Sequence, residues 1–220
     1  MKNKIIIAIF SAVIISTLIF VEYKINYLPK PTVTGGQRGQ LGIDKNINEK
    51  NIDKYLNRKD SVYRDMRMLK DEANYEKIGG DSYLSGFVSG FEVIPFPYIV
   101  NVTGLPKEVG NTYSGKTLYT KKENGKYVAN YKESQEILEY YFPKDKYIFL
   151  MCGGGGYAGM MKNMLVDLGW DEDMIYNVGG YWFYKGKNNE VIKTVRSNET
   201  VYDFWKVTYH DFNFDLLHEV

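Results

Sequence analysis

Residues 148–161 read Ile-Phe-Leu-Met-Cys-Gly-Gly-Gly-Gly-Tyr-Ala-Gly-Met-Met and contain Cys152, the only cysteine of the chain. The run from Lys146 to Met151 that leads into it shows no alternation of apolar and polar residues, which is typical of a strand in a covered parallel sheet. After the glycines, apolar residues recur at helical spacing, and Gly169 provides a helix stop. The stretch therefore predicts a buried strand, a glycine-rich turn and an amphipathic helix.

A second strand is expected over residues 174–178, directly before Gly179 and Gly180. A strand, a helix and another strand in this order predict an α/β domain built on a parallel sheet. Shorter strands, rich in β-prone residues, are expected at residues 61–66 and 98–102. The fold class that follows is α/β.

Three further segments carry local signals. Residues 134–142 are expected to form a helix that Pro143 stops. Asn124 and Gly125 lie between two β-prone arms, which predicts a β-hairpin inserted into the domain. Residues 191–209 are rich in aromatic and β-branched residues and predict a β-rich C-terminal extension, whose place relative to the sheet stays open.

The chain begins with a short cationic segment followed by an apolar run. Residues 5–21 carry no charge and lie directly behind Lys2 and Lys4, as in a signal or membrane anchor. A helix of this length would rise roughly 25 Å, just short of the bilayer core of about 30 Å. The positive start predicts an extracytoplasmic domain. Residues 20–23 are too bulky for signal cleavage, so an uncleaved anchor is expected, with secretion after cleavage as the alternative.

Composition narrows the classes of function. The chain has 220 residues, 44% of them hydrophobic, and a net charge of +1, so one core is expected and nucleic acid is disfavoured as a partner. A single cysteine can neither close an internal disulfide nor build a thiolate metal site, and His210 and His218 lack metal-site spacing. No metal or other cofactor is expected.

Cys152 is expected at the carboxyl end of its strand, where open α/β sheets bind their ligands. The backbone N–H groups of Gly153, Gly154, Gly155 and Gly156 can turn towards the sulfur, and the following helix adds the positive end of its dipole. Such a cradle is expected to lower the thiol pKa below about 8.5 and to make the sulfur nucleophilic. The alternatives are a buried structural cysteine in a plain turn, or a phosphate-binding loop, which the absence of Gly-Lys-Ser/Thr disfavours.

Residues 147–181 contain, in order, the predicted strand, Cys152, a five-residue turn, the predicted helix, Leu-Gly-Trp-Asp and Ile-Tyr-Asn-Val-Gly-Gly. This order resembles the C-terminal half of a rhodanese (sulfurtransferase) domain. Upstream, Asp65-Met-Arg67 resembles the Asp-x-Arg of that family, and residues 83–95 resemble its Gly-His-Ile-x-Gly-Ala segment, with Phe87 in place of the histidine. The resemblance implies a parallel sheet flanked by helices, with Cys152 as the catalytic nucleophile. It implies that the four glycines, with the two residues after them, bind the sulfur substrate.

One departure from the family affects the chemistry. Many relatives carry an arginine on the cysteine loop at the positions that Tyr157 and Ala158 occupy here. Loss of that cation disfavours phosphatase or arsenate chemistry, and thiosulfate as donor, and favours persulfide carriage. The phenolic O–H of Tyr157 is expected either to contact the bound sulfur or to pack internally. Asp65 and Arg67 are expected either to form a structural salt bridge or to lie near Cys152, behind the residues that contact the bound sulfur.

The predicted organisation is an anchor at residues 1–25, a linker at 26–58 with a short helix within it, a rhodanese-like domain at 59–186 and an extension at 187–220. The leading prediction is a sulfurtransferase or sulfur carrier that holds a persulfide on Cys152, with a small sulfur donor and a thiol acceptor as partners. The alternatives are a membrane-tethered, non-catalytic binding module of the same fold and a thiol redox sensor.

Overall fold

The computed structural model describes residues 28–34, 41–103, 105 and 113–220. Residues 31–220 form one compact unit. The predicted anchor at residues 5–21 lies outside the described residues. In the part of the chain that is described, no helix has both the length and the apolar character needed to cross a bilayer.

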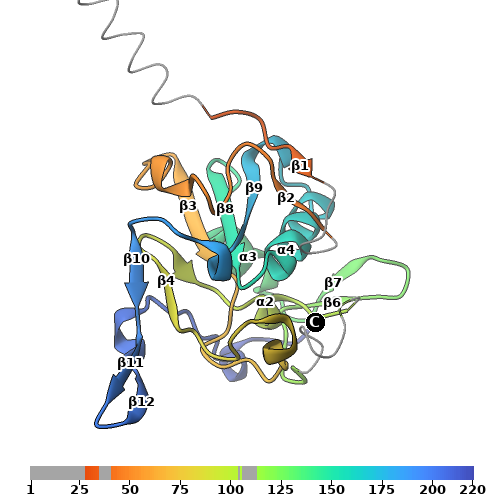
Figure 1. Cartoon of the computed structure of the whole chain (residues 1–220). Helices are drawn as coiled ribbons and strands as arrows, with labels where there is room; N and C mark the ends of the chain where they lie inside the picture. Colours follow the sequence, from red (N-terminus) through yellow and green to blue (C-terminus); the bar gives the residue numbers. More distant parts are fainter. Residues whose placement is uncertain (1–27, 35–40, 104, 106–112) are drawn as a thin grey trace, which may run out of the picture. The chain divides into compact units, whose positions relative to one another are not determined.

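Four parallel strands form the central sheet (Figure 1). Their order is β5 (Glu92–Val93), β3 (Ser61–Asp65), β8 (Tyr147–Cys152) and β9 (Ile175–Gly180). Asp65 pairs with Met151, and Cys152 pairs with Gly180, so the carboxyl ends of β3, β8 and β9 meet at one edge. The predicted α/β class is confirmed, because the structure is a mixed fold with a parallel sheet and small antiparallel hairpins.

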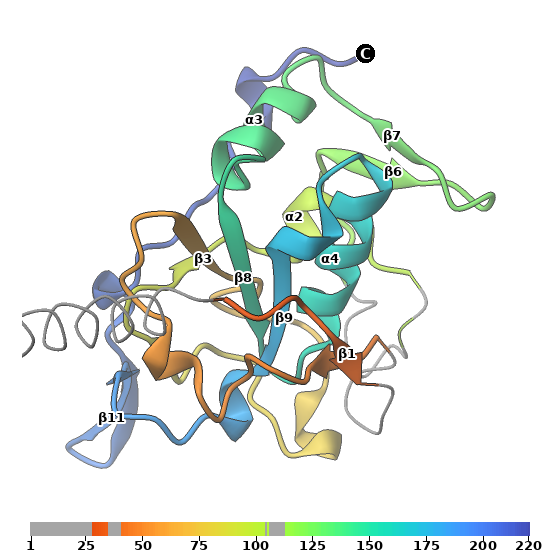
Figure 2. The ribbon, with the colours of Figure 1, turned by 90° about the horizontal axis from the view of Figure 1, so that it is seen from above.

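Within the described ranges, three α-helices contribute to one core with alternate residues of β8. They are α2 (Phe96–Ile99), α3 (Ser134–Tyr141) and α4 (Gly156–Asp167), and Figure 2 shows α4 alongside β9. Ile148 and Leu150 of β8 lie in this cluster. As expected, the helix after the glycines ends before Gly169, whose φ of +94° gives the left-handed turn that ends many helices.

The other side chains of β8 pack against aromatic rings. Phe149 stacks between Tyr63 and Tyr176, with ring centroids 5.2 and 4.8 Å apart. Residues 41–58, within the predicted linker, add Ile47 and Ile52 to the buried core. This region contains a short 3-10 helix, η1 (Ile52–Lys54), and the strand β2 (Ile43–Asp44), which pairs antiparallel with β1 (Val33–Thr34). It therefore behaves as part of the compact unit.

Small antiparallel pairs decorate the sheet. The predicted hairpin is confirmed: β6 (Tyr119–Lys121) pairs with β7 (Tyr127–Ala129), and Gly125 between them has a φ of +82°. The C-terminal region is β-rich as expected, since β10 (Asn189–Val191) pairs with β4 (Gly86–Val88), and β11 (Lys193–Arg196) pairs with β12 (Glu199–Tyr202). Further 3-10 helices are η2 (Tyr75–Ile78), η3 (Glu172–Met174), η4 (Tyr181–Phe183), η5 (Phe204–Lys206) and η6 (Phe214–Leu216).

The strand predicted at residues 98–102 is wrong. The chain instead forms the short helix α2, with Pro97 in its first turn, and only Val100 makes an isolated bridge, to Tyr119. Proline suits the first turn of a helix because its fixed φ is helical and its missing N–H is not needed there. That preference outweighs the β propensity of the apolar residues that follow it.

Candidate functional site

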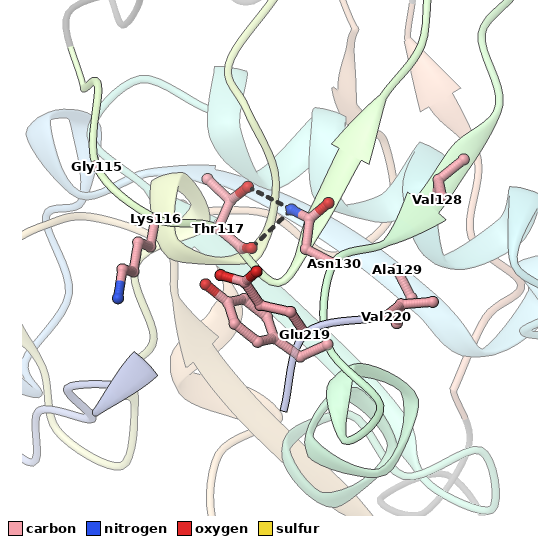
Figure 3. Close-up of a pocket in the computed structure, with 9 residues that line it drawn as sticks. Gly115, Lys116, Thr117, Val128, Ala129, Asn130, Glu219 and Val220 are labelled. Atoms are coloured by element: carbon pink, nitrogen blue, oxygen red, sulfur yellow. Dashed lines mark hydrogen bonds between the residues drawn. The ribbon is translucent and has the colours of Figure 1, made fainter. Parts of the chain in front are cut away.

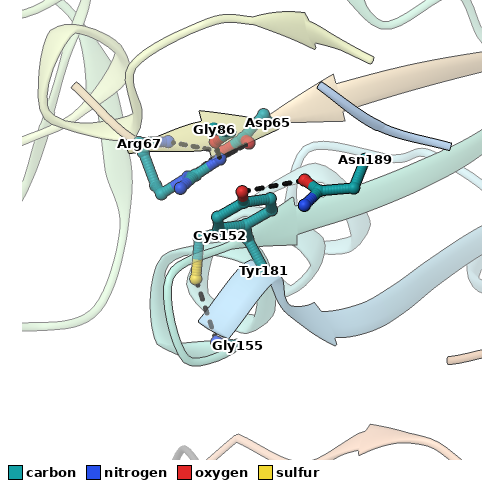
Figure 4. Close-up of polar contacts among 7 residues, drawn as sticks. All are labelled: Asp65, Arg67, Gly86, Cys152, Gly155, Tyr181 and Asn189. Atoms are coloured by element: carbon teal, nitrogen blue, oxygen red, sulfur yellow. Dashed lines mark hydrogen bonds and ion pairs between the residues drawn. The ribbon is translucent and has the colours of Figure 1, made fainter. Parts of the chain in front are cut away.

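Cys152 is the last residue of β8 and is only 3% exposed. The backbone N–H of Gly155 donates to its Sγ over 3.0 Å, and Figure 4 shows the sulfur pointing towards this amide. The helix α4 begins at Gly156, directly after the turn. The sequence thus predicted the position of the cysteine correctly. Of the four glycines whose N–H groups were predicted to turn towards the sulfur, Gly155 is the one whose N–H is seen to donate to it.

The predicted direction of the thiol pKa is wrong. Burial raises the pKa of the Cys152 thiol above its ordinary value. Hydrogen bonds from the backbone N–H groups of Ala158, Gly155 and Tyr157 oppose this rise. The negative charge of Asp65 adds to it. These three backbone donors, one of them from a glycine, do not outweigh the loss of water around the buried sulfur.

A side chain would be strained at one glycine of the site and would clash at another. Gly155 has a φ of +103°, and a Cβ there would lie 3.3 Å from Cγ1 of Ile43. At Gly180 a Cβ would lie 2.2 Å from the carbonyl oxygen of Gly153. The glycine-rich turn and the end of β9 therefore approach each other as bare backbone, which lets the turn close around the sulfur.

The ring of Trp182 lies over the glycine turn. A Cβ on Gly153 would lie 2.5 Å from Cζ2 of Trp182, and one on Gly154 would lie 3.5 Å from Cζ3. The Trp182 ring also meets Tyr75 edge-on, with centroids 5.2 Å apart. A Cβ on Gly80 would lie 2.4 Å from the same ring. Trp182 thus covers the glycine turn.

The hydroxyl of Tyr157 does not face the sulfur. It donates to Oδ2 of Asp71 over 2.9 Å, and the Tyr75 hydroxyl donates to the same oxygen over 2.8 Å. All three side chains are buried. Ala158 is fully buried in the first turns of α4. Of the two interpretations of Tyr157, internal packing is the one that its observed contacts match.

Asp65 and Arg67 form a buried, two-pronged ion pair. Nη2 of Arg67 lies 2.6 Å from Oδ2 of Asp65 and also donates to the carbonyl oxygen of Gly86. The guanidinium carbon stacks 4.4 Å from the ring centre of Tyr181, the residue after β9 (Figure 4). The expected salt bridge is confirmed, and its carboxylate lies near enough to Cys152 to raise the pKa of that thiol.

Asn177 links three segments at the site. Its Nδ2 donates to the carbonyl oxygens of Gly42 and Gly155, and its Oδ1 accepts from the N–H of Gly179. The side chain is 1% exposed. Sequence reasoning missed the roles of Asn177 and Asp71 because their contacts span many residues. An asparagine inside an otherwise apolar strand is the one local signal that was available, since a buried amide needs partners.

A pocket of about 510 Å³ lies away from the cysteine, between residues 115–117, 128–131 and 219–220 (Figure 3). Within it Asn130 donates to the carbonyl and hydroxyl oxygens of Thr117. None of the predicted site residues lines it. Across the described ranges, no three His, Cys, Asp or Glu side chains gather in a way that could hold a metal ion.

The arrangement around Cys152 can hold one sulfur-bound anion in a ring of backbone donors, behind an aromatic cover. Chemistry at this site needs no second cysteine, because the acceptor can be another molecule. Comparison with known proteins adds nothing to this geometry: no protein family, curated protein or solved structure matches the chain.

Proposed function

We propose that the chain carries sulfur as a persulfide on Cys152, in the manner of a rhodanese-like sulfurtransferase. The observation that carries the proposal is the 3.0 Å hydrogen bond from the N–H of Gly155 to the sulfur at the carboxyl end of a parallel strand. A ring of backbone donors stabilises negative charge on the bound sulfur without a metal or a charged side chain. The order of parallel strand, cysteine turn and helix also supports a persulfide carried on Cys152.

The reaction has two displacements at sulfur. The Cys152 thiolate attacks the outer sulfur of a donor persulfide, an S–S bond forms to Cys152, and the donor thiolate leaves with the electron pair of the broken S–S bond. An acceptor thiolate then attacks the outer sulfur of the Cys152 persulfide, which returns the Cys152 thiolate. Each step breaks one sulfur bond and forms another, so no external oxidant or reductant is required.

Burial affects when the site reacts. The raised pKa of Cys152 keeps the resting sulfur protonated near neutral pH. Transfer of sulfur to Cys152 therefore begins when the Trp182 side chain moves off the glycine turn and the thiol ionises among the backbone amides. The persulfide that results is more acidic than a thiol and gains more from the same donors.

The predicted anchor at residues 5–21 completes the proposal. It would tether the sulfur carrier to the membrane, with the domain on the extracytoplasmic side. A small sulfur donor and a thiol acceptor are the partners that this chemistry requires.

The buried thiol favours a second candidate. Cys152 is 3% exposed and burial raises its pKa, which suits a structural cysteine in a tethered module that binds a partner without turnover. The four-glycine turn favours the first candidate, because a plain turn does not need amides directed at a sulfur.

The intact mass of the full chain in neutral detergent separates the two. The protein is exposed to a low-molecular-weight persulfide and, separately, to thiosulfate, with Cys152→Ser as control. A gain of one sulfur, about 32 Da, that a thiol removes and that Cys152→Ser lacks supports sulfur carriage. No gain with either donor in a folded protein refutes it and favours the binding module.

A further inference from the structure

Residues 70–83, here named the cover segment, form a loop whose two ends lie side by side. Lys70 and Tyr83 pair in an antiparallel bridge, and just beyond them the N–H of Leu84 donates to the carbonyl oxygen of Leu69. Leu84 is fully buried in an apolar cluster against which Leu69 also packs. Compact surface loops whose ends lie together are Ω-loops. The cover segment therefore has a fixed neck about which it can move as one piece.

The cover segment is held together by hydrogen bonds within itself. The N–H of Ala73 donates to Oδ1 of Asp71, and the Tyr75 hydroxyl donates to Oδ2 of the same carboxylate. The Ser82 hydroxyl donates to the carbonyl oxygen of Ala73, and the N–H of Gly80 donates to that of Tyr75. Because these bonds join residues of the loop to one another, a movement about the neck leaves them intact.

The cover segment packs against the ring that lies over the glycine turn. Tyr75 meets Trp182 edge-on, with ring centroids 5.2 Å apart, and a Cβ on Gly80 would lie 2.4 Å from the Trp182 ring. The same ring lies over Gly153, the residue directly after Cys152. Because Trp182 contacts both the cover segment and the glycine turn, a movement of the segment frees this ring to leave the turn.

Two buried polar contacts tie the cover segment to the body of the domain, and both involve the hydroxyl of Tyr157 in α4. This hydroxyl donates to Oδ2 of Asp71 over 2.9 Å, and its oxygen lies 3.2 Å from the hydroxyl oxygen of Tyr75. A hydroxyl that donates to a carboxylate makes one of the stronger side-chain hydrogen bonds. The backbone N–H of Tyr157 is also one of the donors directed at the sulfur of Cys152. One residue thus joins the cover segment to the site.

We propose that the cover segment is a lid that must open before a sulfur donor or acceptor reaches Cys152, and that the contact between Tyr157 and Asp71 is its latch. The cysteine is 3% exposed, so a second molecule needs an opening to reach its sulfur. An exposed ion pair between Asp81 and Lys193, 3.7 Å long, lies beside the neck and resists this opening little. The inference rests on the proposed function, because it names the movement that admits the donor.

The test measures two rates on the full chain in neutral detergent. Iodoacetamide reports on access to the sulfur, because the thiolate forms a bond to carbon and iodide leaves. Cys152 is the only cysteine, so this labelling reports on the site alone. Hydrogen exchange of the backbone amides of residues 73–80, read by peptide mass, reports on the opening of the segment itself. Because amide exchange does not depend on thiol ionisation, equal changes in the two rates identify the opening as their common cause.

Tyr157→Phe removes the hydroxyl of the latch and keeps the ring, so both rates should rise about tenfold. Tyr119→Phe is the matched control. This buried tyrosine loses a 2.8 Å hydrogen bond to Gln135, away from the cover segment, and should leave both rates within about twofold. An unchanged labelling rate in Tyr157→Phe, or an equal rise in Tyr119→Phe, overturns the proposal.

A urea series on the wild-type protein keeps the proposal testable even if Tyr157→Phe fails to fold. A lid exposes little surface when it opens, so the labelling rate should change by about twofold at most between 0 and about 1 M urea, whereas global unfolding would raise it about tenfold or more. A labelling rate that follows global unfolding overturns the proposal. Failure of the proposed function is a separate result, in which neither donor adds sulfur to Cys152, whatever the opening rate of the cover segment.

Discussion

The backbone N–H of Gly155 donates to Sγ of Cys152 over 3.0 Å, from a residue whose φ is +103°. One residue thus both reverses the chain after β8 and holds the sulfur. The left-handed conformation is what directs this amide inward, so the geometry of the turn and the chemistry of the sulfur depend on the same backbone torsion.

Replacing Gly155 by Ala should therefore weaken the hold on the sulfur. The Cβ would be strained at this φ and would press on Ile43 at 3.3 Å, so the turn must shift. We expect a loss of about 1–3 kcal/mol in unfolding free energy and a further rise in the Cys152 thiol pKa. The pH profile of iodoacetamide labelling measures the second effect. Gly125→Ala has similar backbone strain, with no atom within 4 Å, and should leave that profile unchanged.

The stability of the protein should fall in mildly alkaline solution through Cys152. Burial raises the folded pKa of the thiol above the unfolded value of about 8.5, so the folded state holds the proton more tightly. This contribution is fully present below the unfolded pKa and is lost as the pH rises towards the folded pKa, at up to about 1.4 kcal/mol per pH unit. Urea unfolding at pH 7.5 and 9.5 should show a steeper loss for wild type than for Cys152→Ser. Parallel losses would contradict the prediction.

Removing the ring of Trp182 should expose the cysteine. With Trp182→Ala, the glycine turn loses the side chain that lies over it, and iodoacetamide should label Cys152 about tenfold faster at constant pH. Phe183→Ala, at a neighbouring position that is already 42% exposed, serves as the control and should change the rate little. If both variants react at the wild-type rate, the site opens by another movement.

The ion pair between Asp65 and Arg67 should behave as a structural unit. Arg67→Gln leaves a fully buried carboxylate without its cation, and we expect a loss of about 3–5 kcal/mol in unfolding free energy. Asp65→Asn combined with Arg67→Gln removes both charges and should recover much of that loss. Urea unfolding of the three proteins tests this. A double variant as unstable as the single one would show that the hydrogen bond to Gly86 matters more than the charges.

Local sequence patterns were sufficient for β8, the cysteine turn, α4 and β9. Each of these elements is specified by signals within a few residues: an apolar run, four glycines, a helical repeat and a glycine stop. The hairpin at Gly125 was predictable for the same reason. The segment around Tyr98 was not, because proline at the start of a helix and β-prone residues after it give opposite signals at that position.

The features that define the site most closely depend on distant contacts. Asp71 and Tyr157 are 86 positions apart, and Trp182 meets Gly80 and Tyr75 across the fold. No period or motif encodes such pairs. The thiol pKa was mispredicted for the same reason, since the depth of burial depends on which segments cover Cys152, whereas the amide donors are local.

The two hydrogen bonds that Asn177 donates have a mechanical consequence. One goes to Gly42, next to β2, and the other to Gly155, the residue that holds the sulfur. A shift of the β1–β2 pair would thus reach the reactive turn through the Asn177 side chain, as well as through the packing of Ile43 on Gly155. A shift of that pair is expected to loosen the contact between Gly155 and the sulfur before the four parallel strands separate, so the reactivity of Cys152 would report on the position of β2.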